Sequence, residues 1–263
     1  MRNSIYQILT KKEVKNWRRE KEKEWEKNAD FWIKIIRENL DPFRPVITNR
    51  VVLESLRREK NLKILDAGCG EGYLCRDLVK RGHRLFGIDF CPKLIKTAKD
   101  LERKKPLGIK YLVGDFRKTN YPPSFFDVIL SHQTINEIEN PEKAFKEFFR
   151  ILKRNGRLIL LFLHPCFDIQ VKNLKNTLSL VYFKKTKIKR GYYLVSGIKS
   201  PSPYFYLHLP LEDWIRLLGE AGFSISKIRE PHPSLKLLKK DKWWKENFER
   251  PRFILIETRK FIP

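Results

Sequence analysis

The stretch Asp66-Ala67-Gly68-Cys69-Gly70-Glu71-Gly72 decides the fold, and the short apolar run Lys63-Ile64-Leu65 precedes it. An apolar run that ends in an acid and alternate glycines is typical of a strand that turns sharply into a helix, because glycine allows backbone conformations that a Cβ would block. Residues 72–80 have apolar side chains at helical spacing, and Gly82 is suited to end that helix. Ligands of open α/β sheets bind beyond the carboxyl ends of the strands, so this loop is predicted to bind a ligand.

Apolar runs and helical stretches alternate along the chain around this loop. Besides 63–66, strands are predicted at 84–89, 111–113, 126–130 and 157–162. Helices are predicted from Pro92 and from Asn140 to Arg154. Strands that alternate with helices indicate right-handed crossovers and a parallel sheet, and continuous apolar runs indicate strands covered on both faces. The predicted fold is therefore α/β, a Rossmann-like, doubly wound sheet.

The flanking segments differ from this rhythm and predict a lid. Residues 1–60 are predicted to form an N-terminal helical lid, with helices at 11–27, 29–39 and 51–58, and residues 61–263 to form the main domain. Within the main domain, 168–209 is predicted to be a lid or substrate insertion built on a β-hairpin. Its strands are predicted at 178–183 and 192–195, around the basic stretch 184–191.

The end of the chain returns to the main domain, with a helix at 210–221 and strands at 223–229 and 253–259. The tryptophan pair Trp243-Trp244 is compatible with a base-stacking platform, but a partly buried C-terminal segment is the preferred interpretation.

The glycine spacing separates two classes of nucleotide ligand. A dinucleotide site needs Gly-x-Gly-x-x-Gly, whereas here the third glycine, Gly72, comes one position early. Asp66 beside the loop would repel a phosphate and suits an ammonium group. Asp89 and Asp115 end the next two strands, where they can accept hydrogen bonds from a ribose diol and an adenine amino group. Three acids at successive strand ends predict a positively charged adenosyl amino acid.

The sequence resembles the class I S-adenosylmethionine-dependent methyltransferases. The resemblance rests on residues 64–74, Gly87-Ile88-Asp89-Phe90, Gly114-Asp115-Phe116 and 126–131, in this order. It implies a seven-stranded, mostly parallel sheet whose last strand, 253–259, is antiparallel. The implied cofactor is S-adenosylmethionine, with S-adenosylhomocysteine as product. The implied cofactor-binding residues are Asp66, Gly68, Cys69, Gly70, Gly72, Asp89, Phe90, Asp115, Phe116 and Ser131.

The flanks are similar to small-molecule methyltransferases of the quinone- and metabolite-modifying group. The similar pieces are residues 28–32, 41–44, 164–167 and 206–211. Trp32, Arg44 and Tyr206 are the candidate substrate residues. His132, His164 and His208 are the candidate general bases, although a lone histidine is often a satisfied structural residue.

Composition leaves the methyl acceptor open. The formal net charge is +25, which makes RNA a second candidate partner and a tRNA or rRNA methyltransferase an alternative function. After the fourth strand, however, the chain reads Leu130-Ser131-His132-Gln133, without the Asn/Asp-Pro-Pro-Tyr/Phe signature of nucleic-acid amino methylases. A non-catalytic module that binds the cofactor is a third alternative. No apolar run reaches the length of a membrane span, no metal-ligand spacing occurs, and a cytoplasmic location is expected.

Overall fold

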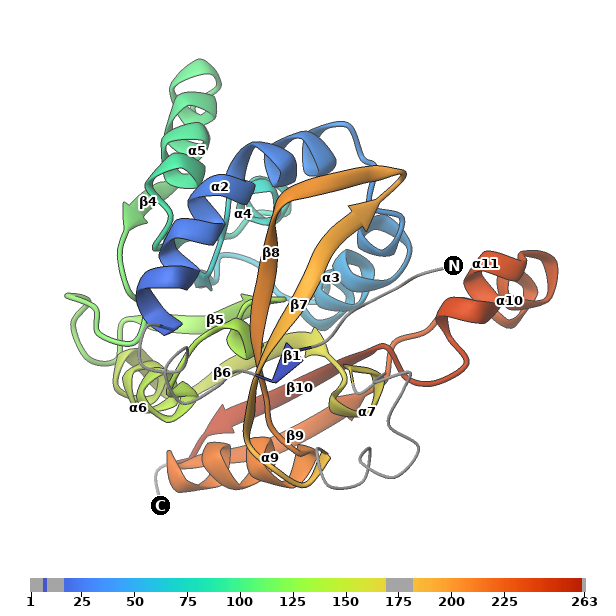
Figure 1. Cartoon of the computed structure of the whole chain (residues 1–263). Helices are drawn as coiled ribbons and strands as arrows, with labels where there is room; N and C mark the ends of the chain where they lie inside the picture. Colours follow the sequence, from blue (N-terminus) through green and yellow to red (C-terminus); the bar gives the residue numbers. More distant parts are fainter. Residues whose placement is uncertain (1–6, 9–16, 169–181, 262–263) are drawn as a thin grey trace.

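The computed structural model describes residues 7–8, 17–168 and 182–261, and its centre is a seven-stranded sheet (Figure 1). The strand order is β4-β3-β2-β5-β6-β10-β9. The strand bounds are Lys63–Ala67 (β2), Arg84–Asp89 (β3), Lys110–Val113 (β4), Phe126–His132 (β5), Leu152–Leu163 (β6), Phe223–Arg229 (β9) and Phe253–Lys260 (β10).

The pairing of the strands confirms the predicted topology. β2 pairs in parallel with β3 and β5, β3 with β4, and β5 with β6. β10 is antiparallel to both of its neighbours, β6 and β9. The chain order reverses between β2 and β5, so the loops after these strands open a crevice at the carboxyl edge, where ligands of such sheets bind.

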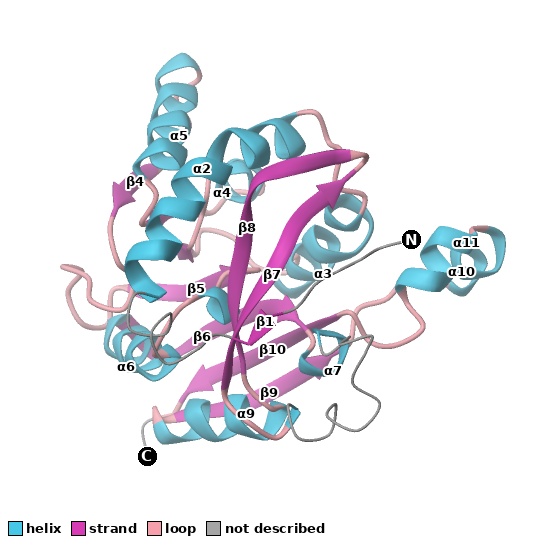
Figure 2. Ribbon diagram, viewed as in Figure 1, coloured by secondary structure: helices cyan, strands magenta, loops and turns pink. Residues whose placement is uncertain are grey.

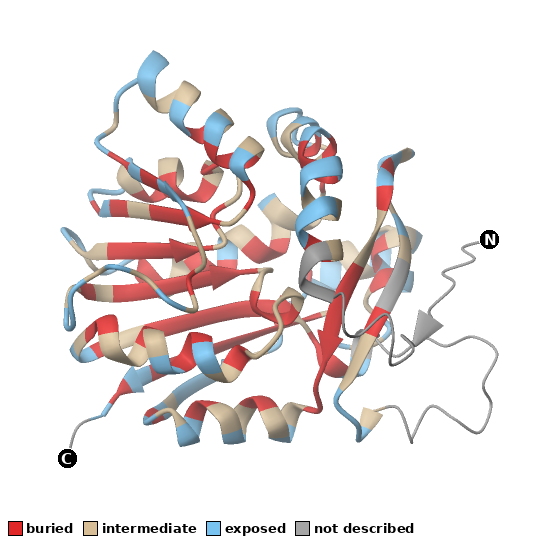
Figure 3. Cartoon of the chain, turned by 60° about the vertical axis from the view of Figure 1, so that its left-hand side comes forward, coloured by how far each residue is buried: buried red, intermediate tan, exposed pale blue. Residues whose placement is uncertain are grey.

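Helices cover both faces of the sheet, and Figure 3 shows its strands buried along much of their length. On one face lie α6 (Pro141–Ile151) and α9 (Leu211–Glu220), whose Phe145, Phe148 and Trp214 reach the core. On the other face lie α3 (Asn49–Leu56), α4 (Tyr73–Val79) and α5 (Pro92–Lys104). Neighbouring residues of one strand enter opposite cores, as Val128 and Ile129 do, because side chains alternate across a sheet.

The N-terminal segment is one continuous helix, α2 (Trp17–Arg37), so the expectation of two helices was wrong over its described part. Residues 11–16 of the first predicted helix lie outside the described residues. Asn28, which lies between the two predicted helices, does not interrupt α2. Its buried side chain hydrogen-bonds to strand β8: the amide N–H donates to the Ser202 carbonyl at 3.2 Å, and the amide oxygen accepts from the Ser202 N–H at 2.9 Å.

A three-stranded antiparallel sheet, in the order β1-β7-β8, lies beside α2 (Figure 1). β1 is Gln7–Ile8, β7 is Thr186–Val195 and β8 is Ile198–His208. The predicted β-hairpin exists, but the predicted position of its turn was wrong. Residues 186–191 of the basic stretch belong to strand β7, and the turn lies at Ser196 and Gly197, both with positive φ. Residues 178–181 of the predicted first strand lie outside the described residues, and Tyr182 and Phe183 belong to no strand.

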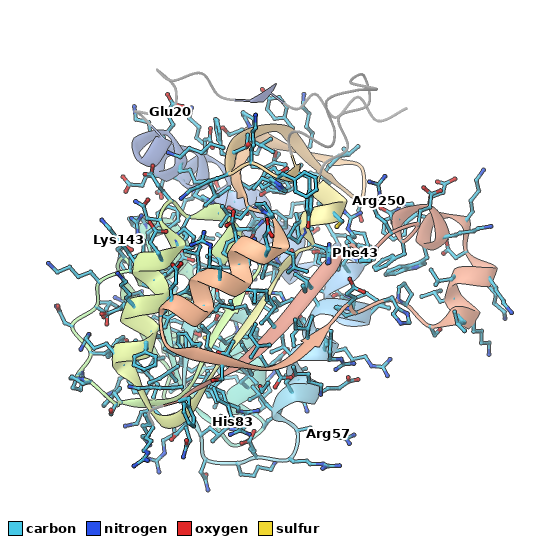
Figure 4. All side chains as sticks on the ribbon, turned by 90° about the horizontal axis from the view of Figure 1, so that it is seen from below. Glu20, Phe43, Arg57, His83, Lys143 and Arg250 are labelled. Atoms are coloured by element: carbon cyan, nitrogen blue, oxygen red, sulfur yellow. The ribbon has the colours of Figure 1, made fainter. Side chains whose placement is uncertain are left out.

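Short helices complete the chain: a π-helical turn, η1 (Arg44–Thr48), a 3-10 turn, η2 (Ile135–Glu137), α7 (Pro165–Asp168), α10 (Leu235–Lys240) and α11 (Lys242–Asn247). The last two project from the body of the molecule (Figure 2). Phe43, labelled in Figure 4, lies at their base and stacks on Trp243 with ring centroids 5.2 Å apart, while Trp244 is buried. These contacts agree with the partly buried segment rather than the stacking platform. None of the described helices has the length and apolarity that crossing a membrane requires.

Candidate active site

The glycine loop between β2 and α4 adopts left-handed backbone conformations at Gly68, Gly70 and Gly72, with φ of +86°, +57° and +80°. A Cβ on Gly68 would lie 2.3 Å from Thr134, and one on Gly72 would lie 2.3 Å from the Tyr111 hydroxyl. A Cβ on Gly70 would meet nothing within 4 Å. Gly68 and Gly72 therefore allow tight packing of the protein on itself, and only Gly70 leaves space in which a ligand could approach the backbone.

Two buried acids flank this loop at the strand ends. The Asp89 carboxylate accepts hydrogen bonds from the N–H groups of Gly70 and Cys91, both at 2.9 Å. Among the described residues, Asp66 accepts one thiol contact of 3.4 Å, from Cys75 on Oδ2, and its buried Oδ1 has no hydrogen-bond partner. Burial raises the pKa of Asp66 to about 7 and that of Asp89 to about 6. A positively charged ligand would supply the partner that Asp66 lacks.

A cavity of about 1080 Å³ opens beside the loop, at the carboxyl ends of β2, β3 and β5. Of the predicted cofactor residues, it is lined by Asp66, Gly68, Cys69, Gly70, Asp89 and Phe90. Its remaining walls come from α2, from η1, from the loop after β5 and from the hairpin β7–β8. The cavity therefore joins the predicted cofactor loop to the two segments that were predicted to form the lid.

A second cavity of about 500 Å³ adjoins the first, and Phe90, Glu137 and Ile138 line both. Asp115 and Phe116, the residues predicted to hold an adenine edge, line the second cavity. The Asp115 carboxylate is already engaged by the Arg117 guanidinium, with contacts of 2.7–3.1 Å. Oδ1 also accepts from the Arg117 backbone N–H at 2.9 Å, so Arg117 contacts both oxygens of this carboxylate.

His132 is the one predicted base that lines the larger cavity. Its Nδ1 lies 3.1 Å from the Tyr73 hydroxyl, which donates to Asn49 Oδ1 at 3.1 Å. Because the Tyr73 hydroxyl directs its proton to Asn49, the Tyr73 oxygen accepts a hydrogen bond from the Nδ1–H group of His132. Nε2 of His132 therefore carries no proton and keeps its lone pair. Nε2 is buried without a partner among the described residues. Burial, together with the nearby Arg44 charge, lowers the pKa of His132 to about 3, so the ring is neutral.

The other two predicted bases line neither cavity. His164 Nδ1 accepts from the Cys166 N–H at 3.1 Å, and its Nε2 lies 3.1 Å from the Glu230 carboxylate. His208 Nε2 lies 2.9 Å from the Tyr182 carbonyl oxygen. Both side chains are buried outside the two cavities, and His164 Nε2 makes no hydrogen bond among the described residues.

Two predicted cofactor residues also lie outside both cavities. Ser131 is fully buried in β5, and its side chain points away from the ligand space because His132, the next residue of the strand, points into it. Gly72 caps the start of α4, where the Tyr111 hydroxyl donates to its carbonyl oxygen at 3.3 Å.

All three predicted substrate residues, Trp32, Arg44 and Tyr206, line the larger cavity. The sequence analysis missed further wall residues from distant segments: Trp25, Tyr73, Gln133, Thr134, Glu137, Tyr193 and Tyr204. The rings of Tyr193 and Tyr204 stack with centroids 3.8 Å apart. Their signal was present as the aromatic residues of the 168–209 insertion, but which of them face inward depends on the hairpin register.

Comparisons with known proteins agree with this geometry. A methyltransferase domain model matches residues 65–160. A ubiquinone biosynthesis O-methyltransferase of Pelagibacter ubique is 29% identical over 165 residues, which are 59% of this chain and 66% of the relative. A demethylmenaquinone methyltransferase of Chlorobaculum tepidum is 27% identical over 203 residues, which are 74% of this chain and 78% of the relative.

Solved structures share the fold. A putative S-adenosylmethionine-dependent methyltransferase from Listeria monocytogenes superposes with a TM-score of 0.63 at 24% identity, covering 77% of this chain and 91% of that one. One from Mesorhizobium loti gives 0.62 at 20% identity, covering 80% and 96%. The matched domain, the sheet order and the glycine loop between two strand-end acids together support a class I S-adenosylmethionine-dependent methyltransferase.

Proposed function

We propose that the methyl acceptor of this enzyme is a small molecule held in the larger cavity. The observation that carries the proposal is the cavity itself, which runs from the glycine loop to walls of aromatic side chains. Side chains of α2, η1 and the hairpin β7–β8 wall this cavity beside the glycine loop, an arrangement that suits a small acceptor next to the cofactor. The names of the quinone-biosynthesis relatives support the same substrate class.

The residues of the glycine loop fit the cofactor that the family uses. Asp66 would hold the ammonium group, Asp89 the ribose hydroxyls, and Asp115 with Phe116 the adenine edge. The unpartnered Asp66 Oδ1 and the open space beside Gly70 support this assignment. When bound, the cofactor supplies a methyl group already activated by a sulfonium, so the chain's own task is to align the acceptor and exclude water. Such alignment lowers barriers by about 7–11 kcal/mol.

α2 and the hairpin β7–β8 are proposed to be the lid over this space. Glu137 of η2 connects them: it accepts hydrogen bonds from Lys21 at 3.1 Å and Trp25 at 2.8 Å, both on α2, and from the Tyr193 hydroxyl of β7 at 3.4 Å. Within the predicted 1–60 lid, α3 packs instead into the main core. The proposed lid is therefore α2 together with the insertion.

His132 is proposed to take the proton of an acceptor hydroxyl. A general base contributes roughly 10²–10⁴-fold when the nucleophile carries a proton. The neutral ring, its fixed Nδ1 and its unpartnered Nε2 support this role. The ring is a weak base in the ligand-free protein, so its part is to accept the proton as the new bond forms rather than to ionise the acceptor beforehand.

The test uses methyl-labelled S-adenosylmethionine and cell extract separated into small-molecule, RNA and protein fractions. We expect label in the small-molecule fraction, and none with an Asp89→Ala variant that fails to bind S-adenosylhomocysteine in calorimetry. Label that enters only RNA or protein would overturn the small-molecule acceptor. An RNA methyltransferase remains the second candidate because of the net charge of +25.

A further inference from the structure

Arg44 is a charged wall residue that the proposed mechanism does not use. Its guanidinium carbon lies 5.6 Å from the centroid of the Trp32 ring and 4.8 Å from that of Tyr73. Its Nε lies 3.2 Å from Asp41 Oδ2, and Asp41 is itself fixed by the Phe43 N–H at 3.0 Å. The guanidinium is therefore held between two rings before any ligand binds, and its Nε pairs with Asp41 by charge without forming a hydrogen bond among the described residues.

Four carboxyl groups of the described residues line the larger cavity. Those of Asp66 and Asp89 lie beside the glycine loop, where a cationic cofactor fits, whereas those of Glu71 and Glu137 are paired with Arg76 and Lys21. Of the described residues that line this cavity, Arg44 alone carries a positive charge, and it lies on the wall formed by η1 and α2. A positive site beyond an acidic cofactor site favours an acceptor of opposite charge to the cofactor.

A second donor in the same wall lacks an acceptor. The indole N–H of Trp32 is buried and has no hydrogen-bond partner among the described residues. A buried donor without an acceptor is unfavourable, and an oxygen anion bound beside Arg44 would satisfy it. The neighbouring wall is aromatic: the Trp32 ring meets that of Tyr193 edge to face, with centroids 4.9 Å apart, and Tyr193 stacks on Tyr204. Such walls favour a planar ligand.

We infer that the methyl acceptor is a hydroxylated aromatic carboxylate, with its carboxylate against Arg44 and the Trp32 N–H. The inference rests on the proposed small-molecule function and narrows its substrate class. The acceptor's phenolic oxygen gives its proton to His132 Nε2 and forms the new C–O bond as the C–S bond of the sulfonium breaks. The sulfur keeps that electron pair, so the products are an aryl methyl ether, S-adenosylhomocysteine and a protonated histidine, which returns its proton to water.

The test compares an acid with its neutral ester on the protein saturated with S-adenosylhomocysteine. The probes are 3,4-dihydroxybenzoate and methyl 3,4-dihydroxybenzoate, titrated by calorimetry, because the ester keeps the ring and hydroxyls but removes the charge. We expect the acid to bind roughly tenfold more tightly or better, since a charge-assisted pair is worth more than a neutral one. Arg44→Gln is expected to abolish that preference, and Arg44→Lys to retain part of it.

Arg50→Gln is the matched control, because the Arg50 side chain is 71% exposed on α3 and pairs with Glu54 outside the cavity. It should leave the preference unchanged. Equal binding of acid and ester, binding of neither, or a preference that survives Arg44→Gln would overturn the inference. The titration with S-adenosylhomocysteine separates this failure from that of the proposed function: a protein that binds the cofactor product and methylates neutral small molecules would overturn only the anionic substrate class.

Discussion

Burial moves the pKa values of two cavity-lining side chains, Asp66 and His132, in opposite directions, and both shifts favour the neutral form. The pKa of Asp66 rises to about 7 and that of His132 falls to about 3. In both cases the largest cause is the loss of water around a charge. The ligand-free cavity therefore carries little charge at these two residues, and a cation bound beside Asp66 would restore the carboxylate.

Binding of the cofactor is expected to release a proton from Asp66. Below pH 7 the free protein holds this carboxyl mostly protonated, whereas a bound cation favours the carboxylate, so affinity for S-adenosylmethionine should rise with pH between about 5 and 7. The expected change is roughly tenfold per pH unit below the pKa. Calorimetry at pH 6 in buffers of different ionisation enthalpy measures the proton. Asp66→Asn should bind more weakly and release fewer protons, with the remainder coming from Asp89, whose pKa is about 6; an equal release from that variant would contradict the assignment.

The His132→Asn variant is expected to lose roughly 10²–10³-fold in kcat, because it removes the group that accepts the acceptor's proton. Its affinity for S-adenosylhomocysteine should stay within about twofold, since the proposed cofactor contacts involve other residues. The rate is measured with the labelled small-molecule fraction. His164→Asn is the control, because His164 lines neither cavity, and it should keep kcat within about threefold. Equal losses in the two variants would remove His132 from the mechanism.

The residues that were predictable from the sequence are those whose function depends on position along a strand. Asp66, Asp89 and Asp115 end successive strands, and a parallel sheet brings such ends to one edge. Tyr73 was not predictable as a partner of His132, because the two lie 59 residues apart and meet only through the pairing of β2 with β5. Ser131 and His132 show a further limit: they are adjacent, yet only His132 faces the cavity.

At the scale of elements, regular βα units were predictable and the lid was not. Strands of the large sheet follow from apolar runs bounded by glycine and helix starts. In the insertion, the basic stretch 184–191 overlaps the start of strand β7, so its composition suggested an exposed turn, although Ile188 alternates with basic residues as a strand requires. Composition also misled the prediction of α2. The polar residue Asn28 lies at the helix centre, where it bonds Ser202 of β8 and does not end the helix.

Asn28 is expected to hold the lid closed. Its side chain makes two buried hydrogen bonds to the backbone of Ser202 in β8. Asn28→Ala leaves the buried Ser202 N–H without this acceptor, at a cost of about 1–3 kcal/mol, whereas the Ser202 carbonyl keeps the Ser200 hydroxyl as a donor. Hydrogen exchange should then accelerate in residues 186–208 while the large sheet keeps its protection. Asp30→Ala is the control, because the Asp30 side chain is 72% exposed and pairs only with Lys93 at the surface. A uniform acceleration would mean that Asn28 stabilises the whole fold instead.

At the scale of the whole molecule, the net charge of +25 contrasts with the acids around the predicted cofactor site. Much of the excess basic charge is on exposed residues, such as those of α10 and α11, where lysine is abundant. The composition gives the excess of positive charge directly, but it does not identify the molecule that this charge would bind. A positive surface attracts any polyanion, whereas methyl transfer depends on the enclosed cavity, so binding to RNA and catalysis can be separated by salt.

Binding of RNA by this chain is expected to be non-specific and to disappear at moderate salt. Each phosphate contact releases counterions, so a protein that makes 6–10 such contacts loses about 10³–10⁵ in affinity between 50 and 200 mM salt. Labelled transfer into the small-molecule fraction should change far less over this range, because the site is enclosed and buried interactions are poorly screened. Fluorescence anisotropy with a labelled tRNA and the transfer assay, run at the same salt concentrations, measure both. RNA methylation that persists at 200 mM salt, with no label in small molecules, would instead make the basic surface part of the substrate site.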